Sequence, residues 1–264
     1  MKRLFIIVAF ALIAFPLFAE DTEVDMGTTT NNVFQLRAGA SFNKKISILR
    51  LHFDEQLRFN PYASQTGNSF FNRSHTTVGI GVVPLSFLKV EAGYTLKIYG
   101  NKDWSDVKEW MRHRVYAGLT GSVHFGSRKQ MKLSLRERLL VDMRMDSVNI
   151  NEKPKNALHL RSKLGFEYKF EHVPVKPYLS LEIDNTLNAP KHQQKNGHQY
   201  INEIKATVGT RWKLNKRNAL NFYYRYHYGY DRDVNQKKKN TSIYEITTEK
   251  THIHVIGINY EFDW

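Results

Sequence analysis

Pairs of arginines spaced two residues apart recur in the sequence and could bind anions. The clearest are Arg112 with Arg114 and Arg136 with Arg138. A guanidinium group forms paired hydrogen bonds with a carboxylate or a sulfate, and a β-strand places residues i and i+2 on the same face. If the two strands are adjacent, we expect their arginines to stack. The candidate anion track consists of Arg112, Arg114, Arg136, Arg138, Arg161 and Lys163.

These basic residues belong to long segments in which apolar and polar side chains alternate. In the segment 130–145, Leu133, Leu135 and Leu139 share one face, whereas Arg136 and Arg138 share the other. Such alternation indicates a strand with one apolar and one polar face. The predicted strands are 33–42, 46–59, 74–83, 87–99, 111–125, 130–145, 157–171, 175–187, 199–212, 218–230 and a closing strand that ends at Trp264.

The connectors between these segments alternate in length. Short turns are predicted near Asn43–Lys45, Pro84–Ser86, Gly126–Arg128, His172–Pro174 and Asn215–Arg217. Longer polar loops are predicted at 60–73, 100–110, 146–156, 188–198 and 231–241. Membrane barrels place short turns on the periplasmic side and longer loops outside.

The closing strand favours a membrane barrel over other all-β folds. Ile256, Ile258, Tyr260, Phe262 and Trp264 share one face, and a terminal aromatic residue is typical of the strand through which the barrel-insertion machinery binds. Only helices and closed barrels satisfy every backbone polar group within lipid. The predicted fold class is therefore all-β, a transmembrane antiparallel up-and-down β-barrel of about 12 strands (roughly 10–12).

The first residues fit a cleaved signal peptide over 1–19. Lys2 and Arg3 precede the apolar core Leu4–Phe15, and a cleavage region ends at Ala19. Residues 20–264 would then form the barrel domain in the outer membrane of a Gram-negative bacterium. The chain has no Cys, so neither a disulfide nor a lipid-anchoring cysteine is available.

The strand count leaves a problem at the start of the barrel. If Trp264 lies in the periplasm, counting backward makes 33–42 a descending strand, and another strand is expected before it. Bacterial single-chain barrels usually have an even number of strands. The polar segment 20–32 is therefore expected either to supply a twelfth strand or to thread the lumen.

The formal net charge of +14 points to anionic partners. Export argues against nucleic acid, which leaves outer-membrane lipid, lipopolysaccharide and small anionic solutes. Arg232 and the run Lys237–Lys239 could bind lipopolysaccharide phosphates from an external loop. For so short a run, a solvated loop is the favoured interpretation.

No motif indicates an enzyme, and no cofactor or metal site is predicted. None of the histidines that could act as a base belongs to a nucleophile motif such as G-x-S-x-G. They are His52, His75, His113, His124, His159, His227, His252 and His254. His252 and His254 share a face, but two ligands are too few for a zinc site, so a position at the lipid headgroups is favoured.

Several short motifs make the chain similar to a known family. They are Phe34-Gln35-Leu36-Arg37, Asn43-Lys44-Lys45-Ile46-Ser47, the strand His52–Phe59, Trp110-Met111-Arg112-His113-Arg114 and the terminal strand. With them the whole mature chain resembles the bacterial outer-membrane proteins grouped as domain of unknown function 2490. The resemblance implies a barrel and carries over no catalytic residue. By architecture alone, the chain is also similar to narrow porins that take up acidic oligosaccharides.

The favoured hypothesis is a narrow channel or binding barrel for small anionic solutes. One alternative is a plugged structural barrel, in which arginines and carboxylates only satisfy one another. Another is an outer-membrane enzyme that acts on lipid or lipopolysaccharide. A soluble periplasmic barrel that binds an apolar ligand would instead bury the apolar faces and leave the arginine-rich faces in water.

Overall fold

The computed structural model describes residues 22–62, 69–100, 110–145, 154–190, 193, 201–236 and 243–264. The predicted signal peptide 1–19 and the run Lys237–Lys239 lie outside these ranges. The elements of the described part are β1 (Thr22–Ile46), β2 (Leu49–Phe59), β3 (Phe71–Leu85), β4 (Leu88–Tyr99), β5 (Met111–Phe125), β6 (Met131–Met143), β7 (Asn156–Tyr168), β8 (Val175–Thr186), β9 (Ile201–Lys213), β10 (Asn218–Gln236) and β11 (Ile243–Asp263). Within these ranges no helix is long and apolar enough to cross a bilayer.

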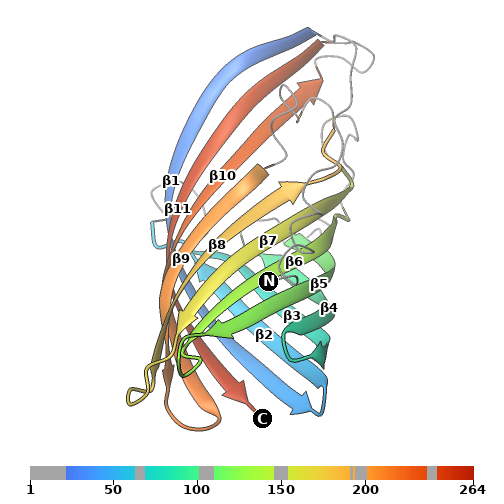
Figure 1. Cartoon of the computed structure of the whole chain (residues 1–264). Helices are drawn as coiled ribbons and strands as arrows, with labels where there is room; N and C mark the ends of the chain where they lie inside the picture. Colours follow the sequence, from blue (N-terminus) through green and yellow to red (C-terminus); the bar gives the residue numbers. More distant parts are fainter. Residues whose placement is uncertain are drawn as a thin grey trace.

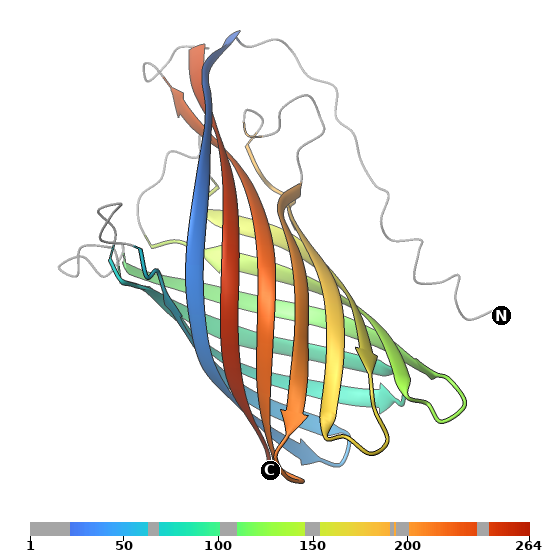
Figure 2. The same ribbon diagram turned by 90° about the vertical axis from the view of Figure 1, so that its left-hand side faces the viewer.

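The strands close into a single barrel in the order of the sequence (Figure 1). Each strand from β2 to β10 pairs antiparallel with both of its neighbours in the chain. The predicted all-β barrel is thereby confirmed, with eleven strands in the described part. The short turns gather at the end that carries the C-terminus (Figure 2). We call it the turn end.

The barrel closes through a parallel pair, β1 with β11. An odd number of strands that alternate in direction makes the first and last strands run the same way. Leu36 lies beside Ile256 and Phe42 beside Phe262 in this seam. At the turn end, the backbone N–H of Trp264 donates to the carbonyl of Asn43 at 2.7 Å. No strand before β1 is needed, which resolves the problem of the strand count.

The seam strands are longer than the sequence patterns predict. Residues 22–32 are neither a twelfth strand nor a segment within the lumen, because they form the first part of β1 and pair with β11. β10 likewise continues to Gln236, and the first turn falls at Ser47–Ile48 instead of Asn43–Lys45. Figures 1 and 2 show β1, β10 and β11 rising beyond the other strands. The first part of β1 is mostly polar and is held by backbone pairing with β11, so the sequence there lacks the apolar alternation that indicates a strand.

The two faces of the barrel have opposite chemistry. Charged and polar side chains inside are buried, for example Arg37, Glu91, Lys97 and Asp184. Large apolar side chains outside are exposed, among them Leu119, Leu139, Leu164, Leu179, Val208 and Ile256. This is the inverse of the soluble barrel considered above, and it suits a barrel with lipid outside and a polar lumen.

Two carboxylic side chains interrupt the apolar outer face. Glu55 on β2 accepts a 2.5 Å hydrogen bond from the Thr76 hydroxyl on β3. Glu137 on β6 accepts one of 2.6 Å from the Ser162 hydroxyl on β7. The register places Glu137 opposite Leu119, on the face that points away from the lumen. Each carboxyl therefore has one local partner on an otherwise apolar surface.

Candidate functional site

The lumen holds all six residues of the predicted anion track. Arg136 lies opposite Lys163 and Arg138 opposite Arg161, but the arginines of β5 do not stack on those of β6 as expected. Arg138 lies opposite Gly118 and Arg136 opposite Thr120, whereas Arg114 lies opposite Asp142. The arginines of β5 are therefore displaced along the barrel from those of β6. Parity assigned these side chains to the lumen, but parity alone does not determine which of them meet.

Four of the six track residues form ion pairs with carboxylates. Arg138 Nη2 lies 2.6 Å from Glu91 Oε1, and Arg136 Nη2 lies 3.6 Å from Glu182 Oε2. Arg161 pairs with Asp184 on the neighbouring strand. Strands β4 to β9 thus form an ion-pair wall in which cations and anions satisfy one another.

The fourth pair joins Arg114 to Asp142, which also binds Lys97. Asp142 accepts a hydrogen bond of 2.7 Å from Arg114 Nη2 and one of 2.6 Å from Lys97 Nζ. The Lys97 side chain is only 5% exposed and that of Asp142 is 18% exposed. A single carboxylate therefore neutralises two cations that are largely removed from water.

The other two track residues have no carboxylate partner among the described residues. Arg112 places its guanidinium 5.0 Å from the ring centre of Tyr99. Lys163 lines a cavity in the lumen, opposite the ion-paired Arg136 and Glu182 in the register. Both are positioned to meet an anion from outside the chain.

A second group of arginines, on β1, β2 and β3, lies on the wall next to the seam. Arg37 is directly opposite Arg58, and Arg58 is directly opposite Arg73. Like charges that face each other on adjacent strands destabilise a sheet. None of the three forms an ion pair with a carboxylate in the described part of the chain. We refer to Arg37, Arg58 and Arg73 as the arginine row.

Neutral groups hold the arginine row in place. Arg37 Nε donates to Gln35 Oε1 at 2.7 Å, and Arg58 Nε donates to Gln56 Oε1 at 2.9 Å. Arg73 Nη1 donates to the Tyr99 hydroxyl at 3.3 Å. A glutamine two residues earlier on the same strand orients a guanidinium without cancelling its charge. The row therefore combines fixed geometry with uncompensated positive charge.

Tyrosines stand at both ends of the row. Arg73 lies opposite Tyr99, and Arg37 lies opposite Gly257, which is itself opposite Tyr223. A Cβ atom at Gly257 would lie 2.1 Å from the Tyr223 ring. Only glycine leaves room for the ring against the barrel wall at this point.

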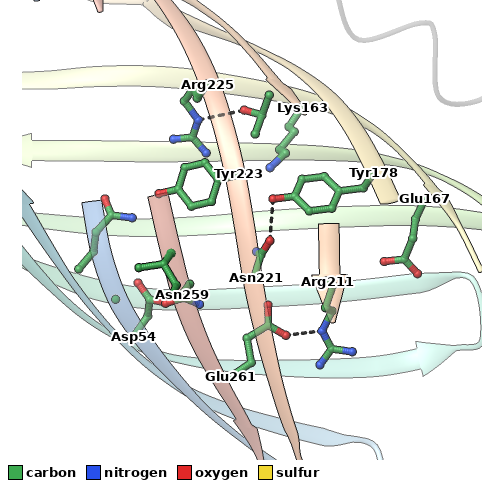
Figure 3. Close-up of a pocket in the computed structure, with 14 residues that line it drawn as sticks. Asp54, Lys163, Glu167, Tyr178, Arg211, Asn221, Tyr223, Arg225, Asn259 and Glu261 are labelled. Carbon is green, nitrogen blue, oxygen red and sulfur yellow. Dashed lines mark hydrogen bonds and ion pairs between the residues drawn. The ribbon is translucent and has the colours of Figure 1, made fainter. Parts of the chain in front are cut away.

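Two cavities lie in the lumen: Arg73 of the arginine row lines one, and Gln56, which accepts a hydrogen bond from Arg58, lines the other. One of about 310 Å³ is lined in part by Gln56, Lys163, Tyr178, Tyr223 and Arg225. Figure 3 shows Arg225 and Lys163 at one end of the view and the Arg211–Glu261 ion pair at the other. The second cavity, of about 380 Å³, is lined in part by Arg73, Arg112 and Arg144. Anion-binding groups therefore reach both spaces.

His159 does not act as a catalytic relay between its two partners in the described part. His159 Nδ1 lies 3.1 Å from both Asp184 Oδ1 and the Thr186 hydroxyl. Because both contacts use the same ring nitrogen, the ring cannot pass a proton from the hydroxyl to the carboxylate. Among the described residues, no group of three or more His, Cys, Asp or Glu side chains could hold a metal ion.

A protein family and a solved structure are similar to this chain. The model of the family described as "Protein of unknown function (DUF2490)" matches residues 34–238. The chain belongs to the DUF2490 family. A solved structure titled "NanC porin structure in rhombohedral crystal form" is similar to this DUF2490 member with a TM-score of 0.41 and 10% identity, over 74% of this chain and 87% of that one. No curated protein matches the chain.

The sequence of this DUF2490 member contains a repeated motif that indicates the arginine row. The alternation of apolar and polar residues alone does not reveal it. The tripeptide Gln-Leu-Arg occurs twice, at Gln35–Arg37 and at Gln56–Arg58. In both copies the glutamine orients the arginine. The candidate track does not include Arg37, and Arg73 lies at the end of the predicted loop 60–73. The repeated tripeptide on two successive strands would have identified the first two members of the row.

Proposed function

We propose that the chain is an outer-membrane barrel whose lumen binds and conducts small anionic solutes at the arginine row. The long connectors would face the outside, the C-terminal strand would bind the insertion machinery, and lipid or lipopolysaccharide would cover the apolar face. Solutes with a carboxylate, sulfate or phosphate group fit the row, because guanidinium groups bind such anions through paired hydrogen bonds.

One observation carries the proposal: three arginines face one another with no carboxylate partner in the described part. The ion-pair wall of the same barrel provides the contrast. There Glu91, two residues after Lys89, accepts hydrogen bonds from both Lys89 and Arg138. At Arg37 and Arg58 the corresponding neighbour is a neutral glutamine. A barrel that only needed rigidity would gain from glutamate at those positions.

The conduction proposal is tested by ion selectivity in planar bilayers. We expect the wild-type barrel to prefer chloride over potassium in a salt gradient. The variant Arg37→Gln/Arg58→Gln/Arg73→Gln should lose most of that preference, because the lumen loses its uncompensated charge. The measurement is the reversal potential of single channels.

A matched control removes the same net charge elsewhere. Lys45, Lys129 and Lys216 are exposed residues at the turn end, and their combined replacement by Gln should leave most of the selectivity intact. Equal loss in both triple variants would refute a role for the row. Absence of any conductance in the wild-type protein would refute conduction and support the structural barrel.

If lipid covers the outer face, the stability of the barrel should depend on Glu137. A carboxyl on a lipid-facing strand costs free energy even when a hydroxyl partners it. We expect Glu137→Leu to raise the free energy of unfolding in phosphatidylcholine vesicles by about 1–2 kcal/mol. Urea titration followed by tryptophan fluorescence measures this change. The replacement Glu171→Leu, in an exposed turn, is the control, and a destabilised Glu137→Leu barrel would argue against lipid at this face.

A further inference from the structure

The outer face of β10 and β11 carries a ladder of tyrosine and histidine rings. The register places Tyr226 opposite His254 and Tyr228 opposite His252. These positions have the opposite parity to Tyr223 and Arg225, which line the lumen cavity. The aromatic ladder therefore points away from the lumen, and its members are Tyr224, Tyr226, Tyr228, His252 and His254.

The rings of the ladder are joined by hydrogen bonds and stacking contacts. Nδ1 of His254 lies 2.7 Å from the Tyr224 hydroxyl, and Nδ1 of His252 lies 2.7 Å from the Tyr226 hydroxyl. Ring centres are 5.3 Å apart for Tyr228 and His252, and 5.5 Å apart for Tyr226 and His254. The five side chains thus form one continuous, fixed surface.

The tyrosine contacts occupy Nδ1 of each histidine and leave Nε2 available to a ligand. When a phenol hydroxyl donates to Nδ1, the neutral imidazole carries its proton on Nε2. In the described part of the chain, Nε2 of neither ring has a hydrogen-bond partner. With the proton on Nε2, His252 and His254 each present one donor to a ligand.

A lysine extends this line of donors along β11. Lys250 shares the outward parity of His252 and His254, so the three side chains follow one another at intervals of about 6.7 Å. The even-numbered residues of 28–36, 202–208, 220–230 and 250–258 point outward. None of these residues is Asp or Glu. No carboxylate on these outward faces competes for the three donors.

The ladder lies where the outer face changes from apolar to polar. Toward the turn end, the outward residues Phe222, Ile256 and Ile258 are exposed and apolar. A similar pair lies on another wall, where the Tyr94 hydroxyl is 2.5 Å from His113 Nδ1, close to the exposed Val115. If lipid covers the apolar face, the ladder is at the level of the headgroups of the outer leaflet.

We propose that Lys250, His252 and His254, held by the tyrosines of the ladder, bind the phosphate of an outer-leaflet lipid headgroup. A lysine ammonium and two imidazole N–H groups complement the charge and the acceptor oxygens of a phosphate ester. The apolar residues below them accommodate the acyl chains. The proposal rests on the membrane location proposed above and is independent of anion passage through the lumen.

Native mass spectrometry of the detergent-solubilised barrel tests this site with two lipids that differ only in the phosphate. Dioctanoyl phosphatidic acid should bind about tenfold more tightly than dioctanoylglycerol, since hydrogen bonds to a charged group account for at least that factor. The variant Lys250→Gln/His252→Gln/His254→Gln should lose this preference. Heat-modifiable migration verifies that the variant is folded, and Lys250→Gln alone should lose part of the preference if the triple variant does not fold.

The control replaces the same residue types at the turn end, as His124→Gln/Lys129→Gln/His172→Gln, and should bind as the wild type does. Equal binding of the two lipids, or undiminished binding by the triple variant, would overturn the proposal. Displacement of the lipid by millimolar inorganic phosphate would indicate a site for free phosphate and would also overturn it. The arginine-row variant should retain lipid binding. Failure of the lipid-binding proposal can therefore be distinguished from failure of the conduction proposal.

Discussion

Replacing Asp142 with Asn is expected to lower the free energy of unfolding by about 3–5 kcal/mol, because it leaves two buried cations without a counter-charge. Asp142 accepts hydrogen bonds from both Lys97 and Arg114. Asparagine has nearly the same shape and keeps one acceptor oxygen, so the loss reports on charge. Denaturant titration in detergent micelles, followed by tryptophan fluorescence, measures it.

The exposed pair of Arg128 and Glu171 supplies the control for this experiment. The Arg128 side chain is 71% exposed, and a pair in water contributes about 0–1 kcal/mol. Glu171→Gln should therefore change the stability little. If Asp142→Asn is no more destabilising than Glu171→Gln, the ion-pair wall does not hold the barrel together.

Replacing Arg58 with Gln is expected to have the opposite sign and to stabilise the barrel. Arg58 is opposed by Arg37 on one side and by Arg73 on the other. Removing the charge of Arg58 relieves two like-charge contacts, each of about 0.2–1 kcal/mol. It leaves no carboxylate without a cationic partner. The free energy of unfolding should therefore rise by about 0.5–2 kcal/mol, measured under the same conditions.

Arg138→Gln is the matched variant on the ion-pair wall. It makes the same chemical change but removes a partner of the buried Glu91, so it should destabilise the barrel. A destabilised Arg58→Gln barrel would show that the arginine row has a structural role. A stabilised one would show that the row persists at a cost to folding, as expected of a binding site.

The alternation along each strand predicts which side chains face the lumen, but it does not predict which of them contact one another. Alternation in 130–145 is a local property, so the inward direction of Arg136 and Arg138 could be inferred from neighbouring residues. Their partners depend on how far each strand slides along the next, and no single segment encodes that shift. The sequence therefore predicted a basic lumen but did not reveal that Arg138 would meet Glu91 and that Arg58 would meet two arginines.

The seam was missed for a related physical reason. Residues 22–32 are mostly polar, and only Val24 and Met26 interrupt them, so they lack the sustained apolar alternation that indicates a strand. Their pairing partner is β11, at the other end of the chain. An expectation of even strand number then favoured a twelfth strand. The direction of β1 was nevertheless correct, and the parallel seam is what that direction requires when β11 runs the same way.

The parallel seam also determines the order in which the barrel can assemble. Every other strand pair joins neighbours in the chain, so it can form as a hairpin over a single connector. The seam alone must bring together the two ends of the barrel domain, and contacts between distant residues form slowly. Until they meet, β1 and β11 are open edges that could pair with another chain. We therefore expect closure to be the last step of assembly and the open sheet to be the species that needs protection.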